Sequence, residues 1–135
     1  MKTHQKDLCP CHSQKNYQDC CMKYHEGGIP QTALQLMRSR YSAYALGLIE
    51  YIIRTTSVEK QRELIHEKQD LLAFSQNTSF EGLEILEVEE GDPVSYVTFK
   101  AKLRQGKTDV SFTEKSRFEK VSGKWYYHSG NVTLG

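Results

Sequence analysis

Four cysteines, all within the first 21 residues, carry the clearest chemical signal in this sequence. Cys9 and Cys11 form one close pair, and Cys20 and Cys21 form a second pair after a stretch of turn-forming residues. Two close pairs of thiolates on two turns are the ligand pattern of a tetrahedral structural metal site. Zinc is the metal that such sites favour, and the ligand type is also compatible with iron. The pattern predicts one metal ion per chain, held by all four cysteines.

Two disulfides are the alternative interpretation, with three possible pairings. Nothing in the sequence predicts an oxidising compartment, and the adjacent Cys20 and Cys21 make poor partners for each other. Histidines could also serve as a fourth ligand, but four thiolates already fill a tetrahedron. The histidines of this polar segment are therefore expected to be exposed: His4, His12 and His25. A site closed by four protein ligands is structural, because a catalytic zinc keeps one position open for water.

Residues 9–21, Cys-Pro-Cys-His-Ser-Gln-Lys-Asn-Tyr-Gln-Asp-Cys-Cys, resemble the SEC-C motif at the C-terminus of the translocation ATPase SecA. The family pattern is C-P-C-G-S-G-K-K-Y-K-x-C-C/H. His12 and Gln14 stand where the family has glycines, which permit a positive φ. The resemblance implies a bound zinc ion and protein partners, either the export chaperone SecB or a ribosome-associated component.

A second group of candidate residues lies on a largely apolar helical stretch. Arg38 and Arg40 accompany Tyr41 and Tyr44, which would suit an anionic ligand bound by a guanidinium and oriented by a tyrosine hydroxyl. The structural alternative, which we favour, is that one arginine links the helix to the sheet while the other is solvated.

Two further pocket candidates lie on the later strands. Arg117 is expected opposite residues 125–127, where cross-strand stacking accounts for it. Trp125 is expected to be a core residue rather than a platform for a substrate.

Glu114 is the best single indication of a site. It shares a strand face with Val110, Phe112 and Phe118, so its carboxylate is expected to point inward among apolar groups, where a charge needs a partner. One hypothesis pairs Glu114 with Arg38 or Arg40 across the helix–sheet interface. The other makes it a catalytic acid or base, with His128 as a candidate second group.

The composition excludes several classes of protein. The chain has 135 residues, with 18 Lys and Arg against 17 Asp and Glu, and it lacks the basic stripe with interleaved aromatics typical of nucleic-acid binding. No apolar run approaches the roughly 18–20 residues of a membrane span. The first residues lack the apolar segment of a signal peptide, so a cytoplasmic location is expected. Neither a P-loop nor a dinucleotide-binding glycine motif occurs.

The elements that must position these side chains fall into a metal-binding module at 1–25, a linker at 26–31 and a larger domain at 32–135. Helical spacing over 32–54, with Thr32 as N-cap and Gly47 as a break, predicts two helices. Capping-box spacing from Thr56 to Glu59 predicts a further helix to about Phe74.

Strand patterns begin after this helix. They predict an antiparallel meander over 80–88, 94–103, 110–121 and 124–132, with an acidic first strand at the sheet edge. Helices followed by such a meander give an α+β fold. The core of the larger domain is expected to be built without cysteines, so this domain should stay folded when the module loses its metal.

Two stretches of the larger domain resemble the bacterial YchJ-like family. They are Leu-Met-Arg-Ser-Arg-Tyr-Ser-Ala-Tyr at 36–44, and Ser-Arg-Phe at 116–118 followed by Gly-Lys-Trp-Tyr-Tyr at 123–127. That family joins a SEC-C motif to a domain of the nuclear transport factor 2 (NTF2)-like fold, a cone in which helices pack on a curved antiparallel sheet and enclose a pocket. The chain departs from the family at 55–58, where many members carry Thr-Trp-His-Pro, and at Ser129, where many carry Asp.

Two function classes follow from these observations. The leading hypothesis is a zinc-binding adaptor or binding protein, linked to the export or translation machinery through its module, with a ligand or client segment in the second domain. The alternative is a small isomerase- or hydrolase-like enzyme that uses Glu114 as base and Tyr41, Tyr44 or Arg38 as polarising groups. An enzyme needs a reachable acid or base beside a donor, and a pocket filled by aromatic side chains would exclude it.

Overall fold

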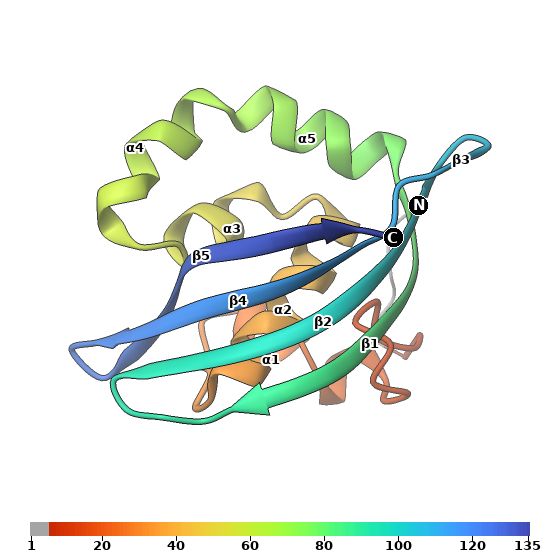
Figure 1. The fold of residues 1–135 in the computed structure, drawn as a ribbon. Helices are drawn as coiled ribbons and strands as arrows, with labels where there is room; N and C mark the ends of the chain where they lie inside the picture. Colours follow the sequence, from red (N-terminus) through yellow and green to blue (C-terminus); the bar gives the residue numbers. More distant parts are fainter. Residues whose placement is uncertain (1–5) are drawn as a thin grey trace.

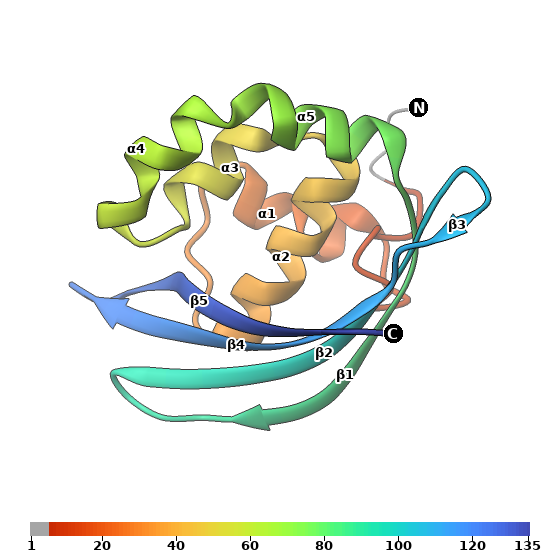
Figure 2. The ribbon, with the colours of Figure 1, turned by 45° about the horizontal axis from the view of Figure 1, so that its top comes forward.

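A curved antiparallel sheet carries all the helices on its concave side (Figures 1 and 2). The computed structural model describes residues 6–135. The order of the main strands is β1 (Ser79–Glu89), β2 (Val94–Gln105), β4 (Phe112–Val121) and β5 (Lys124–Leu134), and the short β3 (Thr108–Asp109) pairs with β2. The four predicted strands and the α+β class are therefore confirmed. The third predicted strand, 110–121, corresponds to β4, which begins two residues later than predicted. Residues 110 and 111 follow β3 and belong to neither strand.

The helix that packs deepest against the sheet is α2 (Ala33–Leu46). Thr32 Oγ1 accepts a hydrogen bond from the Gln35 backbone N–H at 3.1 Å, which confirms the predicted N-cap. Gly47 ends the helix with a φ of 74°, a left-handed conformation that glycine adopts without side-chain strain. The predicted break thus separates α2 from α3 (Ile49–Arg54).

The predicted third helix is instead two helices, α4 (Val58–His66) and α5 (Lys68–Asn77), which lie beyond α2 and α3 as seen from the sheet (Figure 2). The predicted capping box is wrong, because the Thr56 hydroxyl donates to the Ile52 carbonyl at 2.8 Å and Ser57 makes no side-chain cap. No helix within residues 6–135 is long and apolar enough to cross a membrane.

Strand register places alternate side chains in the concavity. Val97, Phe99, Ala101 and Leu103 of β2 are buried, as the alternation predicts. β1 occupies the sheet edge, as predicted for the acidic strand, and its Glu84 lies opposite Lys100 of β2.

The module and the larger domain share one hydrophobic core. Cys9, Cys11, Tyr17 and Cys21 belong to the same buried cluster as Leu36 of α2 and the inner residues of the sheet. The expectation that this core is built without cysteines is wrong, because the cysteine segment packs on α2 and covers it. Residues 26–31 connect the two parts, and the buried residues on either side of this linker form one cluster.

Candidate metal centre and cone cavity

Two short turns bring the four cysteines together. Leu8 and Asn16 form an isolated antiparallel bridge, and the Cys9 backbone N–H donates to the Lys15 carbonyl at 2.8 Å, so the first cysteine pair lies on a tight loop. The second pair follows the short helix η1 (Tyr17–Asp19) and precedes α1 (Met22–His25). All four sulfur atoms lie within 4.8 Å of one another.

The spacing of the sulfur atoms fits a tetrahedral metal ion. Zinc–sulfur bonds of about 2.3 Å place neighbouring sulfurs about 3.8 Å apart. Here Cys11 Sγ lies 3.6 Å from Cys20 Sγ, which in turn lies 3.9 Å from Cys21 Sγ. A disulfide requires about 2.05 Å, and all four cysteines are free. The geometry therefore suits a metal ion and not a pair of disulfides.

The four thiols influence one another strongly. Hydrogen bonds from Cys21 and Cys9 stabilise the Cys11 thiolate and hold its pKa well below the usual range. The same contact with Cys11 raises the pKa of Cys9 to about 12, and it also raises the pKa of Cys21. A metal ion must displace the remaining protons, so metal loading releases protons.

Arg38 supports the cysteine cluster rather than the cavity. Its Nη1 donates to the Cys11 carbonyl oxygen at 3.0 Å and lies 3.9 Å from Cys11 Sγ. The expectation of Arg38 as a pocket residue is corrected, because the module covers the face of α2 that carries this side chain. A guanidinium beside a cluster of thiolates partly balances their negative charge.

Two histidines fasten the module to the larger domain, so the expectation that they are exposed is wrong. His25 Nε2 lies 2.9 Å from the Ser39 carbonyl oxygen. A carbonyl oxygen can only accept a hydrogen bond, so Nε2 carries the proton. Nδ1 then accepts a hydrogen bond from the Tyr17 hydroxyl at 2.6 Å. Burial lowers the pKa of His25. His12 Nε2 donates to the Phe80 carbonyl at 3.1 Å. His4, also expected to be exposed, lies outside the described residues.

The turn between the cysteine pairs keeps the geometry that glycines would permit. His12 has a φ of 62° and Gln14 a φ of 73°. Residues with a side chain rarely adopt this left-handed conformation, which costs about 1–2 kcal/mol relative to the right-handed one. The turn between the two cysteine pairs therefore keeps its shape at an energetic cost at His12 and Gln14.

Replacing Gln14 with glycine is expected to tighten the binding of added zinc about fivefold, because the Gln14 side chain is exposed and makes no hydrogen bond or ion pair with the described residues that would offset its strain. His12→Gly is the matched comparison. It relieves similar strain but removes the bond to Phe80, and it is expected not to tighten binding. Competition with a chromophoric zinc chelator measures both affinities. Weaker zinc binding by Gln14→Gly would contradict the role assigned to the turn.

The cone encloses a cavity of about 290 Å³ between α2, α5 and the inner face of the sheet. Most of its lining is apolar and aromatic, including Phe74, Phe80, Phe99 and Phe112. Four of the predicted pocket residues line it: Arg40, Tyr41, Tyr44 and Glu114. The aromatic side chains surround the cavity without filling it.

Glu114 points into this cavity, as strand alternation predicts. Its Oε2 accepts hydrogen bonds from Ser116 Oγ at 2.5 Å and from the Tyr127 hydroxyl at 2.9 Å. Its Oε1 accepts none from the described residues. The carboxylate lies over Gly130 on β5, where a methyl group would overlap it. Glycine is therefore required at this position for Glu114 to reach Tyr127.

Neither arginine of α2 forms an ion pair with Glu114 within residues 6–135, so this prediction is wrong. Arg40 Nη1 donates instead to the Ile52 carbonyl at 3.0 Å and to the hydroxyls of Thr55 and Thr56 at 2.8 and 3.1 Å. Its guanidinium lies 4.6 Å from the centre of the Tyr127 ring. The end of α3 and the loop after it offer Arg40 a set of acceptors that helical spacing could not reveal.

Tyr127 and Ser116 are the functional candidates that the sequence analysis missed. Tyr127 contacts Arg40 through its ring and Glu114 through its hydroxyl. Burial raises the pKa of Tyr127, and the nearby Glu114 charge raises it further, so the hydroxyl remains a donor. The two-residue turn at 122–123 pairs Tyr127 with the inward Phe118. Counting residues outward from that turn on both strands places Tyr127 opposite Phe118, so the sequence could have identified it.

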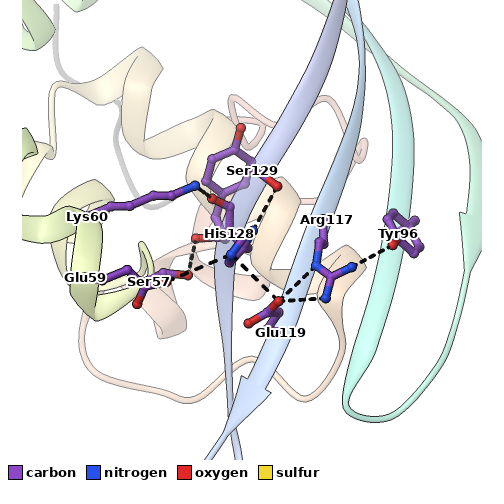
Figure 3. A network of polar contacts seen from close by, with 9 residues as sticks. Ser57, Glu59, Lys60, Tyr96, Arg117, Glu119, His128 and Ser129 are labelled. Carbon is purple, nitrogen blue, oxygen red and sulfur yellow. Dashed lines mark hydrogen bonds and ion pairs between the residues drawn. The ribbon is translucent and has the colours of Figure 1, made fainter.

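Three further candidates, Arg117, His128 and Trp125, do not line the cavity. Arg117 is on the outer face of the sheet, where it contacts Glu119 and Tyr96 (Figure 3). His128 also lies outside the cavity, because it follows the inward-facing Tyr127 on β5, and its Nδ1 lies 2.9 Å from Ser129 Oγ. Trp125 is buried, and its Nε1 donates to the Gln31 carbonyl at 3.3 Å.

A second hollow of about 390 Å³ adjoins the cavity. It shares Arg40, Tyr44 and Tyr127 with the cavity and adds charged residues of α4 and its neighbourhood, among them Lys60 and Glu63. We call this hollow the vestibule. The Lys60 ammonium donates to the His128 carbonyl, which links α4 to β5 at this point (Figure 3). The cavity thus has an apolar interior and a polar side.

Family models match both parts of the chain. The model of the YchJ middle NTF2-like domain matches residues 32–130, and that of the SEC-C motif matches residues 6–23. A UPF0225 protein of Haemophilus influenzae (strain 86-028NP) is 41% identical over 128 residues, which cover 93% of this chain and 78% of the relative. A UPF0225 protein of Actinobacillus succinogenes is 39% identical over 130 residues, covering 94% and 83%.

Solved structures agree with this assignment. The solution structure of a SEC-C motif containing protein from Rhodopseudomonas palustris is 33% identical with a TM-score of 0.83, over 93% of this chain and 98% of that one. A crystal structure of a SEC-C motif containing protein from Psychrobacter arcticus is 28% identical with a TM-score of 0.83, over 97% and 85%. The chain therefore belongs to the YchJ-like UPF0225 family, with a SEC-C motif before an NTF2-like domain.

Proposed function

We propose that this protein binds a small, mainly apolar ligand in the cone cavity, and that a metal-loaded SEC-C module supports the wall of that cavity. The observation that carries the proposal is an apolar cavity of about 290 Å³ with one polar acceptor, Glu114 Oε1, that no described residue uses. Ligand sites combine an apolar lining with a few placed polar groups in this way.

Zinc is the metal proposed for the module, because four cysteines with these sulfur separations suit it. Cys9, Cys11, Cys20 and Cys21 would hold it, and the ion would supply a fixed junction between the two turns. The consequence for the cavity runs through His12. This residue follows Cys11, bonds the Phe80 carbonyl and packs edge-on against Tyr41 with ring centres 5.8 Å apart. Phe80 and Tyr41 both line the cavity.

Ligand binding is tested with three one-ring probes, toluene, benzyl alcohol and benzylamine. A cavity of about 150 Å³ can already hold benzene, so at least one probe is expected to bind with a Kd below about 1 mM. Ala101→Phe, which places a ring in the cavity, should weaken binding at least tenfold. Thr98→Phe is the matched control, because Thr98 lies on the same strand and faces outward. Calorimetric titration measures the probe affinities of the wild-type protein and of both variants. If Ala101→Phe leaves the affinity unchanged, the proposal is contradicted.

A protein partner is the second part of this proposal, and it rests on the resemblance to the SEC-C motif of SecA. The outward surface of the module includes Leu8, which is 60% exposed, and the exposed Lys15 and Lys23. Such a surface suits a component of the export or translation machinery in the cytoplasm, where thiols stay reduced. Co-purification of the intact chain against the Cys9→Ser, Cys11→Ser variant checks this part. A partner retained equally by both proteins would exclude the module as the contact.

An isomerase- or hydrolase-like enzyme is the second candidate, because Glu114 Oε1 offers a base inside the cavity and Tyr44, one of the predicted polarising groups, lines the same cavity. Arg38 does not serve this reaction, since it contacts Cys11, and His128 lines the vestibule rather than the cavity that holds Glu114. A cavity ligand recovered unchanged after incubation with the protein supports the binding function. A chemically altered ligand supports the enzyme.

A further inference from the structure

The carboxylate of Glu114 is the only acidic group that lines the cone cavity among residues 6–135, and it faces a lining made mainly of aromatic rings. We propose that the ligand of this cavity is an amine with an apolar body, whose N–H groups donate to Glu114 Oε1. This assignment rests on the proposed ligand-binding function and narrows it to one chemical class.

The hydrogen bonds of Glu114 define what it still requires. Ser116 and Tyr127 both donate to Oε2, which holds the side chain in place as an acceptor. Oε1 is left without a donor from the described residues. A carboxylate can only accept, and its hydrogen bonds with cationic donors are roughly twice as strong as those between neutral groups. A protonated amine supplies both the donor and the opposite charge.

The aromatic lining also favours an amine over an anion. Tyr41 and Phe80 pack edge to face with ring centres 5.6 Å apart, as do Phe74 and Phe80 at 5.9 Å and Phe99 and Phe112 at 6.2 Å. Ring faces carry negative electrostatic potential and attract cations, while the ring surfaces accept the apolar body of the ligand. An anion in the same space would meet both the rings and Glu114.

Arg40 is the positive charge that must be weighed against this assignment. Tyr127 lies between Arg40 and Glu114, with its ring against the guanidinium and its hydroxyl on the carboxylate. Arg40 Nη1 is occupied by the Ile52 carbonyl and by two threonine hydroxyls. Its charge nevertheless weakens the attraction for an amine, so we expect a preference of about tenfold rather than a larger one.

The test compares four probes that each carry one phenyl ring: benzylamine, benzyl alcohol, toluene and phenylacetate. Calorimetric titration of the full chain at neutral pH is expected to show benzylamine binding about tenfold tighter than benzyl alcohol, with phenylacetate weakest. Glu114→Gln should bring the amine and alcohol affinities together, because it keeps the shape and removes the charge. Gly130→Ala should have the same effect by displacing the carboxylate without removing it. Glu119→Gln, on the outer face, is the matched control and should leave the preference unchanged.

The other possible outcomes contradict the ligand-binding function, the amine assignment or the role of Glu114. If none of the four probes binds, the proposed ligand-binding function fails, and the amine assignment fails with it. If benzyl alcohol or toluene binds as tightly as benzylamine, the cavity binds ligands but the amine assignment is wrong. Tightest binding of phenylacetate would make Arg40 the recognising group. A preference that survives in both Glu114→Gln and Gly130→Ala would exclude Glu114 as its source.

Discussion

Replacing Cys9 and Cys11 by serine is expected to remove the metal and to lower the free energy of unfolding of the larger domain by about 3–5 kcal/mol, the range for losing a large buried side chain. The reason is the shared core, in which Cys9, Cys11 and Tyr17 cover Leu36 of α2. When the module loses its metal it loses its fold, because it is too short to form a core alone. The remaining helices and sheet should stay folded at a lower denaturation midpoint.

Elemental analysis of the reduced protein and chemical denaturation measure these two effects. The wild-type chain should carry one metal ion and unfold in a single transition. Gln18→Ser, an exposed substitution in the same module, is the control and should change neither result. Absence of metal from the reduced wild-type protein would refute the metal site. An unchanged midpoint in the double variant would show that the module contributes nothing to the stability of the domain.

Replacing Arg40 with alanine is expected to lower the free energy of unfolding by about 2–4 kcal/mol. Arg40 is buried, and its guanidinium bonds to Ile52, Thr55 and Thr56 and stacks on Tyr127. Hydrogen bonds of charged groups contribute about 1.5–3 kcal/mol, and part of this loss is offset because the Thr56 hydroxyl still donates to the Ile52 carbonyl.

Arg117→Ala is the matched control for this variant. Arg117 also contacts a tyrosine, and it pairs with Glu119, but it lies on the outer face of the sheet, so its removal should leave the midpoint nearly unchanged. Urea denaturation followed by circular dichroism measures both variants. If Arg40→Ala shifts the midpoint no more than Arg117→Ala, the bonds from α2 to the end of α3 and the following loop do not stabilise the protein.

Features set by local spacing could be predicted from the sequence. The cysteine cluster, the N-cap at Thr32 and the break at Gly47 depend on residues a few positions apart. The inward direction of Glu114 follows from the two-residue period of a strand. These expectations required no knowledge of which segments meet in space.

Features set by contacts between distant segments could not be predicted. The partners of Arg40 depend on where the end of α3 and the following loop pass, and no periodicity within α2 reveals that position. The docking of His12 and His25 depends on the angle at which the module meets α2. The failed capping box at residues 56–59 shows the same limit, since the Thr56 hydroxyl is taken by the preceding helix.

The sharing of one core between the module and α2 has a consequence for the order of events during synthesis. The four cysteines span residues 9–21, and several of the contacts that dock their segment come from α2, which ends at Leu46. Contacts between near neighbours form faster than the pairing of distant strands. The metal-bound half can therefore assemble while the strands from Ser79 onward are still being made. The sheet would then close over a finished surface, and a cell short of the metal would expose that surface to aggregation.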